Sequence, residues 1–149
     1  AVLALRSSSS PILLTSTVNG ALGGLVGITA GCATMAPAFA LLTGLVAGRI
    51  YPDVAPSGAG LPRIVYQQVG GQAMTYLEGA LPDKENARMQ VVCWAATRLA
   101  AINLEKQVEA AIVAATTIQA TPLGARVSDY EADTQLYGAR QDFSVWTAR

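Results

Sequence analysis

A run of 42 residues without a single charge, from Ser7 to Gly48, constrains this chain more than any other feature of its sequence. Arg6 is the only charged residue before the run, and the other 19 of the 20 charged residues follow it. A long uncharged segment is covered either by lipid or by protein, because charged side chains are what normally keeps a surface hydrated. The sequence therefore begins with a membrane-like segment or with a small-residue segment that is buried against protein.

The membrane interpretation depends on Ile12–Ala33, which is long enough to cross a bilayer because a spanning helix needs about 20 residues. Several of its glycines recur at four-residue spacings that favour close helix packing in lipid: Gly20, Gly23, Gly24, Gly27 and Gly31. A signal peptide is a second interpretation, with Arg6 as its basic start and small residues around Ala33. Ser, Thr and Asn side chains dilute the hydrophobicity of the stretch, so both interpretations remain open from composition alone.

The ionisable residues exclude most kinds of catalytic site. Ten Lys and Arg balance ten Asp and Glu, which argues against a basic nucleic-acid-binding domain. The chain has no His, so Ser-His-Asp and Cys-His catalytic sites and His-ligated zinc are excluded. Its two cysteines, Cys32 and Cys93, are too few for a four-cysteine zinc site, and each is interpreted as a packing residue. We expect no enzyme activity, no cofactor and no metal site.

One cluster of carboxylates tests that expectation. Asp129, Glu131 and Asp133 are spaced by two residues, as the first ligands of a calcium loop are. A calcium loop also needs further ligands and a glycine at its sixth position, and neither follows here. We interpret the cluster as a solvated hairpin.

Alternating hydrophobicity predicts four strands, over residues 63–69, 87–95, 126–130 and 139–147. In the second of these, Met89, Val91 and Cys93 face one side, while Val92 and Trp94 face the other. Residues 53–62, rich in Pro and Gly, predict a surface loop, and residues 72–86 predict a long polar connection. A short extended piece is expected over residues 49–51, since Pro52 disfavours a helical Tyr51.

Residues 97–115 give the strongest helical pattern of the chain. Their apolar stripe consists of Ala100, Leu104, Val108, Ala111, Ile112 and Ala115. Glu105, Lys106 and Glu109 are expected to lie largely off this stripe. A shorter helix is expected over residues 36–46, ended by Gly48. The order helix, strand, strand, helix, strand, strand predicts an α+β fold, an antiparallel four-stranded sheet with helices packed on one face.

The remaining face of that sheet carries Val65, Val92 and Trp94, which is more apolar surface than monomers usually expose. We therefore expect this face, or a strand edge, to meet another subunit. The candidate interface residues are Arg49, Asp53, Tyr76, Leu77, Trp94 and Trp146. Arg49 and Asp53 flank Tyr51-Pro52, and Tyr76 and Leu77 lie in the long connection. Trp94 and Trp146 are included because tryptophans at an interface contribute much of the binding energy. Each pair also has a simpler interpretation. The charged residues would be solvated in a loop, the Tyr-Leu pair would lie in a mobile hairpin tip, and the tryptophans would pack in the core.

Several stretches, taken in order, resemble the tail completion proteins of long-tailed bacteriophages, also called tail terminator or tail-to-head joining proteins. They are Ala36-Pro-Ala-Phe-Ala-Leu-Leu42, Gly48-Arg-Ile-Tyr-Pro-Asp-Val-Ala-Pro56, Leu61-Pro-Arg-Ile-Val-Tyr-Gln-Gln-Val-Gly-Gly71, Asn86-Ala-Arg-Met-Gln-Val91 and Arg140-Gln-Asp-Phe-Ser-Val-Trp146. The resemblance covers residues 35–149 and leaves residues 1–34 without a counterpart. It divides the chain into an uncharged N-terminal extension (1–34) and a tail completion-like domain (35–149), with Met35 as a plausible initiator of the native protein.

The resemblance implies a structural virion protein of the tail or neck, assembled in the host cytoplasm. Such proteins form a ring, usually a hexamer, that caps the tail tube and joins it to the head connector. The implied partners are copies of the same chain, the tail tube protein and a head connector or neck protein, with no sequence-specific contact to nucleic acid.

A second resemblance is confined to the uncharged segment. Thr17-Val-Asn-Gly-Ala-Leu-Gly-Gly-Leu-Val-Gly-Ile-Thr-Ala-Gly-Cys32 is similar to a transmembrane segment of the ammonium transporter family. The other spans of that family and its pore histidines have no counterpart in this chain. The alternative function is therefore a small membrane-anchored protein with a soluble α+β domain.

Overall fold

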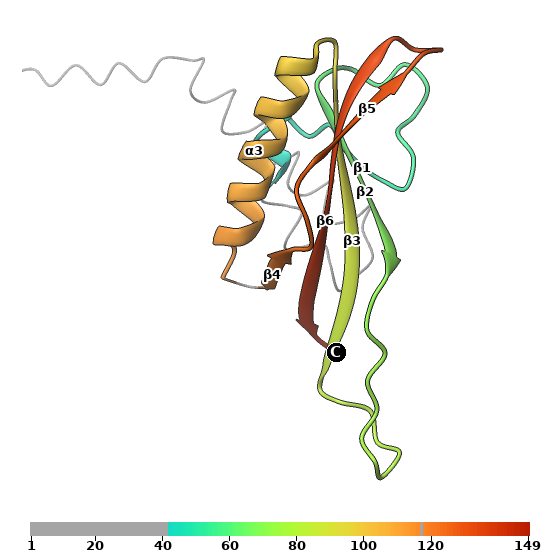
Figure 1. Ribbon diagram of the computed structural model, residues 1–149, viewed down its shortest axis with the longest axis vertical. Helices are drawn as coiled ribbons and strands as arrows, with labels where there is room; N and C mark the ends of the chain where they lie inside the picture. The colour runs from blue at the N-terminus through green and yellow to red at the C-terminus, as the bar shows by residue number, and fades with distance from the viewer. Residues whose placement is uncertain (1–41, 117) are drawn as a thin grey trace, which may run out of the picture.

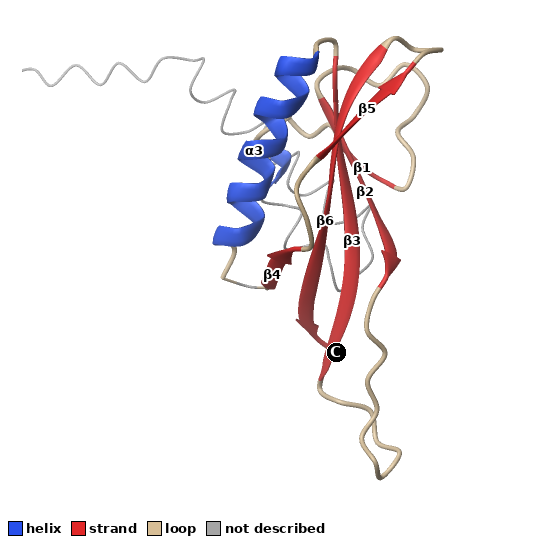
Figure 2. Cartoon of the chain, viewed as in Figure 1, coloured by secondary structure: helices blue, strands red, loops and turns tan. Residues whose placement is uncertain are grey.

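The computed structural model describes residues 42–116 and 118–149, which form one mixed β-sheet with a helix packed on one of its faces (Figure 2). This arrangement confirms the predicted α+β class. In chain order the elements are β1 (Ile50–Pro52), β2 (Arg63–Gly70), β3 (Lys84–Ala95), α3 (Arg98–Ala114), β4 (Gln119–Pro122), β5 (Val127–Glu131) and β6 (Leu136–Ala148).

Strand order in the sheet is β1-β2-β3-β6-β4, and β5 pairs with the first part of β6 (Figure 1). The predicted four-stranded antiparallel sheet is therefore wrong in two respects. β1 adds a parallel strand beside β2, and β4 adds a short antiparallel strand beside β6. Both strands are too short for a periodic signal, and both form only because a longer neighbour supplies hydrogen-bonding partners.

The predicted strands at residues 63–69, 87–95, 126–130 and 139–147 correspond to β2, β3, β5 and β6. β3 begins three residues earlier than predicted, at Lys84, and β6 begins at Leu136. The extra residues at the start of β3 pair with the end of β6, from Lys84 opposite Ala148 onward. Pairing with a distant strand thus extends β3 into the polar sequence Lys84-Glu85-Asn86.

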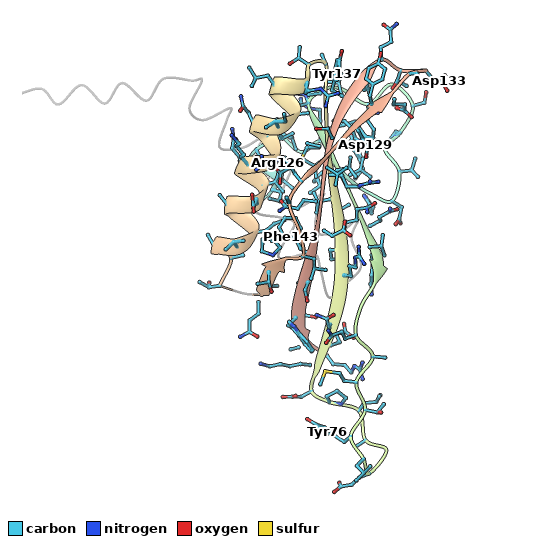
Figure 3. The ribbon with its side chains drawn as sticks, viewed as in Figure 1. Tyr76, Arg126, Asp129, Asp133, Tyr137 and Phe143 are labelled. Atoms are coloured by element: carbon cyan, nitrogen blue, oxygen red, sulfur yellow. The ribbon has the colours of Figure 1, made fainter. Side chains whose placement is uncertain are left out.

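The core lies between α3 and one face of the sheet. Figure 3 shows Phe143 of β6 on this side, beneath the helix, and its side chain is fully buried. The other principal core residues alternate along the strands with outward-facing ones: Ile64, Tyr66, Ala87, Met89, Val91, Cys93 and Val145. Leu42 and Val46 complete the same cluster from the segment that precedes β1.

That preceding segment fits its predicted helix over residues 36–46 only in part, because the described residues 44–48 form turns. Leu42 and Thr43 are helical, and Gly48 follows with a φ of 81°, which suits a glycine at a helix end. Residues 36–41 of the predicted short helix lie outside the described residues. So do Ile12–Ala33, Cys32 and the whole extension. Among the described residues, no helix is both long and apolar enough to cross a membrane.

The helix α3 begins after Thr97, the first residue of the predicted helical pattern, whose hydroxyl accepts a hydrogen bond from the N–H of Ala100 and caps the helix. Its buried face differs from the predicted stripe. Ala100 is exposed while Ala101 is buried, and Glu105, expected off the stripe, is only 2% exposed. The guanidinium of Arg126, in the segment between β4 and β5, forms an ion pair with Glu105. This pairing compensates the burial of Oε2, while the buried Oε1 has no hydrogen-bond partner among the described residues, and it allows the helix to turn that side toward the sheet.

We predict that Arg126→Met destabilises the protein by about 3 kcal/mol, because it leaves the Glu105 carboxylate buried without its partner. The double variant Glu105→Met/Arg126→Met should recover most of that loss, since two apolar side chains replace the pair. Urea unfolding at a fixed protein concentration measures both. Lys106→Met, on the exposed side of the same helix, is the control. Equal stability of the two Arg126 variants would contradict the prediction.

Candidate subunit interface

The sheet face opposite α3 is uncovered by any element in the described part of the chain (Figure 2). We call it the outer face. Its side chains are mostly half-buried by their own neighbours, and they are Tyr51, Arg63, Val65, Gln67, Arg88, Gln90, Val92, Trp94, Arg140, Asp142, Ser144 and Trp146. The face carries a polar middle and an apolar end, and these two regions differ in what they offer a partner.

A chain of hydrogen bonds occupies the polar middle and crosses three strands. Gln67 donates to Gln90 (Nε2 to Oε1, 3.0 Å), and Gln90 donates to Asp142 (Nε2 to Oδ1, 3.1 Å). Arg88 approaches the same carboxylate and donates from Nε to Oδ2 at 2.9 Å. We call these four residues the polar row. Because their polar groups already satisfy one another, the row fixes the strands rather than presenting unpaired groups.

The pKa of Asp142 reflects this setting. Partial burial opposes ionisation of the carboxyl, but the hydrogen bonds from Arg88 and Gln90 and the charges of Arg88 and Arg140 outweigh it. The net effect holds the pKa of Asp142 below its ordinary value of 3.8. The ionised form is thus the one that stabilises the fold.

At the apolar end, the outer face is hollowed to a volume of about 530 Å³. We call this the apolar hollow. Its walls come from loop 53–61, from β2 and β3, and from the β5–β6 turn: Asp53–Ala59, Leu61, Arg63, Val65, Trp94, Glu131, Thr134 and Leu136. The indole of Trp94 lies over Gly138, where an added Cβ would come within 3.0 Å of ring atom Cζ3. The glycine in β6 therefore gives Trp94 its place on the face.

Arg63 is the one cation in the wall of the apolar hollow. Its Nη1 donates to the carbonyl of Ala59 at 3.1 Å, while its buried Nε has no hydrogen-bond partner in the described part of the chain. Within residues 42–116 and 118–149, no carboxylate forms an ion pair with Arg63. The hollow thus combines apolar side chains with Arg63 and two carboxylates, Asp53 and Glu131, neither of which is paired with Arg63.

Residues 71–83, which we call the arm, connect β2 to β3 and project past the end of the sheet (Figure 1). Two backbone hydrogen bonds close the tip, from Tyr76 N–H to the carbonyl of Ala80 at 3.0 Å and from Gly79 N–H to the carbonyl of Tyr76 at 2.9 Å. Gly79 has a φ of 80°, a conformation that favours glycine. The tip is therefore a defined turn.

The base of the arm is tied to the sheet through Asn86. Its side chain accepts a hydrogen bond from the N–H of Gln72 at 3.0 Å and donates to the hydroxyl of Ser144 at 2.8 Å. Gly71 packs so closely that an added Cβ would lie 2.2 Å from the carbonyl oxygen of Asn86. Only glycine fits there, and the arm leaves the sheet in a fixed direction.

The arm is exposed and largely apolar, so the predicted polar connection over residues 72–86 is wrong, because its polar residues 84–86 belong to β3. Leu77 at its tip is fully exposed, and the other exposed large apolar side chains are Met74, Tyr76 and Leu81. Figure 3 shows Tyr76 far from the body of the sheet. Glu78 is the only charged residue between Gly71 and Pro82, and it forms no ion pair with any described residue. An apolar projection of this kind is typical of an interaction surface.

The structure groups the predicted interface residues into separate places. Asp53 and Trp94 both line the apolar hollow, and Tyr76 and Leu77 lie together at the tip of the arm. Trp146 also lies on the outer face, but far from Trp94. It pairs with Asn86 at one end of β6, whereas Trp94 of β3 pairs with Gly138 at the other end.

Arg49 is not brought together with Asp53. The Nε of Arg49 donates to the carbonyl of Pro62 at 2.8 Å. Among the ion pairs of the described residues, none joins Arg49 to Asp53. Sequence reasoning missed Arg63 and Glu78. The sole signal was strand alternation, which places Arg63 on the same face as Val65 and Trp94.

The other candidate groups have ordinary structural surroundings. Asp129 pairs with Arg140 at 3.5 Å, and Glu131 accepts a hydrogen bond from the hydroxyl of Thr134. Among the described residues, no group of acidic or Cys side chains is arranged to hold a metal ion. Cys93 is fully buried, as predicted, and burial together with the charge of Glu105 raises the pKa of its thiol.

Two family models match the chain. The model described as tail completion protein gp17 matches residues 36–148, which include all the elements above. The model of the ammonium transporter family matches residues 2–56. The described part of this range includes β1, which is a strand of the sheet. No curated protein matches the chain.

We predict that Asp142→Asn lowers the free energy of unfolding by about 1 kcal/mol at neutral pH, because a neutral amide loses the charge-assisted bonds of the polar row. Since the folded-state pKa of Asp142 is depressed, its contribution is present above its ordinary value of 3.8 and lost as the pH falls through the folded value. Urea unfolding of both proteins between pH 7 and pH 2 measures the difference. Asp133→Asn, in the exposed β5–β6 turn, is the matched control. A difference that stays constant down to the lowest pH would contradict the assignment.

Proposed function

Because the chain belongs to the tail completion protein gp17 family, a structural family of bacteriophage tails, we propose that it is a ring-forming subunit that caps the tail tube and joins it to the head connector. The family match over residues 36–148 carries this proposal. Its mechanism is recognition between surfaces and involves no catalytic turnover. The proposed partners are copies of the chain, the tail tube protein and a connector or neck protein, all within the virion.

The uncovered outer face supports a role in assembly. Trp94 is half-buried and lies beside Val65 in the wall of the apolar hollow. This apolar surface would be removed from water by a second subunit. Two dissimilar surfaces, the hollow and the arm, favour head-to-tail contacts, and such contacts close into a ring when their rotation permits. The proposed domain for this role is residues 35–149, with residues 1–34 as an extension outside it.

A second candidate function rests on the ammonium transporter match, which reaches back to residue 2. In that case a segment near the N-terminus would anchor the sheet domain to a membrane. The two candidates differ in their need for detergent.

The first experiment is the mass of the purified full chain in buffer without detergent, measured by light scattering after size exclusion, with the N-terminus read by mass spectrometry. We expect a soluble closed particle of about six copies. Protein that remains soluble only in detergent would favour the membrane-anchored candidate.

We predict that Trp94→Ala weakens association at least about tenfold, because a tryptophan at an interface contributes about 2 kcal/mol or more. Trp146→Ala should weaken it as well. Urea unfolding should change less than association, since both indoles lie on the outer face and not in the core. Leu99→Ala, 69% exposed on α3, is the control. A particle mass that does not change over a dilution series would refute the role of either tryptophan.

A further inference from the structure

Arg63 and Glu78 are two opposite charges that form no ion pair with any described residue of the same molecule. Arg63 lies in the apolar hollow, and its buried Nε has no hydrogen-bond partner among residues 42–116 and 118–149. Glu78 lies on an apolar tip and forms no ion pair with a described residue. A guanidinium that is partly withdrawn from water is best satisfied by a carboxylate.

These two groups cannot meet within one molecule. Arg63 begins β2 opposite Trp94, whereas the arm begins after Gly70, opposite Arg88 at the other end of that pairing. From Arg63 to Gly70 the strand advances by seven residue steps, about 23 Å at 3.3 Å per step, and the arm then continues away from the sheet (Figure 1). Any contact between the tip and the hollow is therefore a contact between two molecules.

We propose that the tip of the arm of one subunit inserts into the apolar hollow of a second copy, where Glu78 pairs with Arg63. Leu77 and Tyr76 fill the apolar part of the hollow beside Trp94. The inference rests on the proposed ring function and names the surfaces through which its subunits meet. Each subunit offers one arm and one hollow, so the contact is head-to-tail.

Polarity and size both favour a second copy as the occupant. The hollow has a volume of about 530 Å³, within the range of about 300–1,000 Å³ that pockets for small molecules occupy, so it has room for the exposed tip side chains. Its walls include Val54, Leu61, Val65 and Trp94, which match the apolar surface of Leu77 and Tyr76. The tip brings one carboxylate, Glu78, and the hollow holds one guanidinium, Arg63, that forms no ion pair with the hollow's own carboxylates or with any other described residue. A second copy of the chain supplies this match to every subunit.

The hollow also contains two carboxylates, and neither takes the place of Glu78. Glu131 is held by the hydroxyl of Thr134 at the β5–β6 turn. Asp53 is exposed, and its backbone N–H donates to the carbonyl of Tyr66. Neither forms an ion pair with Arg63, so the guanidinium still lacks a carboxylate partner.

A charge exchange in the full-length chain tests the proposal. Glu78→Arg and Arg63→Glu should each raise the concentration of half-assembly at least about tenfold, because each places like charges at the contact. The double variant Glu78→Arg/Arg63→Glu should return to within about threefold of the wild type, since the pair is restored in reverse. Sedimentation velocity over a concentration series gives these values.

Matched controls separate the contact from net charge and from folding. Asp83→Arg makes the same charge change at the base of the arm, and Lys106→Glu makes the reverse change on the exposed side of α3. Both should assemble as the wild type does. Glu78→Arg lies on an exposed tip, so its folding should be unaffected even where Arg63→Glu loses stability with the bond to Ala59.

Each other outcome overturns the proposal at a different level. An intact ring for Glu78→Arg would overturn the contact and leave the ring function standing. A ring that persists in Glu78→Arg but no longer binds tail tube protein would assign the arm to the tube instead of to a second copy. A wild-type chain that stays monomeric at all concentrations would overturn the ring and the contact together.

Discussion

The pairing of β3 with β6 is the constraint on which the rest of the structure depends. The two strands pair without a break from Lys84 opposite Ala148 to Ala95 opposite Tyr137. Since successive side chains point to opposite faces, one register assigns every residue of both strands either to the core or to the outer face. The same register that buries Phe143 opposite Met89 also sets Trp94 over Gly138. A slip by one residue would exchange the two faces, so the core and the candidate interface are consequences of a single pairing.

That pairing also separates the two surfaces that a partner would use. β2 follows β3 only as far as Gly70, while β3 begins at Lys84, so the intervening chain extends past the sheet as the arm. At the opposite end, the loop after β1 and the β5–β6 turn lie around Trp94 and form walls of the hollow. One surface projects and the other recedes, at opposite ends of the same strands. Two such surfaces favour contacts between different patches over a self-complementary patch.

How far the sequence predicts this fold depends on whether each signal is local. Alternation along β2, β3, β5 and β6 is a local property, and it placed these four strands within a few residues. β1 and β4 are three and four residues long, and their pairing depends on neighbours that are distant in sequence. The buried face of α3 was predicted with Glu105 outside it, because the partner of that carboxylate, Arg126, lies beyond the end of the helix and β4.

The residues of the candidate site also differ in whether local sequence is enough to predict them. The composition of the long connection was sufficient to select Tyr76 and Leu77, and strand alternation was sufficient to put Trp94 on the uncovered face. The charges at the two surfaces required the structure. Whether an arginine is paired depends on every element around it, so no pattern near Arg63 distinguishes it from Arg88, which lies on the same face and is bound by Asp142. The sequence already shows that Glu78 has no charged neighbour in the arm, but only the structure shows that it lies at an exposed tip without an ion pair to any described residue.

Under the proposed contact, the base of the arm acquires a role that its own stability does not require. A head-to-tail contact closes into a ring only if the angle between the two surfaces is the same in every subunit, and otherwise it continues as a filament. Asn86 fixes that angle by binding the N–H of Gln72 on one side and the hydroxyl of Ser144 on the other. Gly71 allows the arm to pass directly against the backbone of Asn86, at a distance that excludes any side chain. The apolar tip supplies surface to bury, but the polar base sets the direction in which it is presented, and that direction determines how many copies complete a circle.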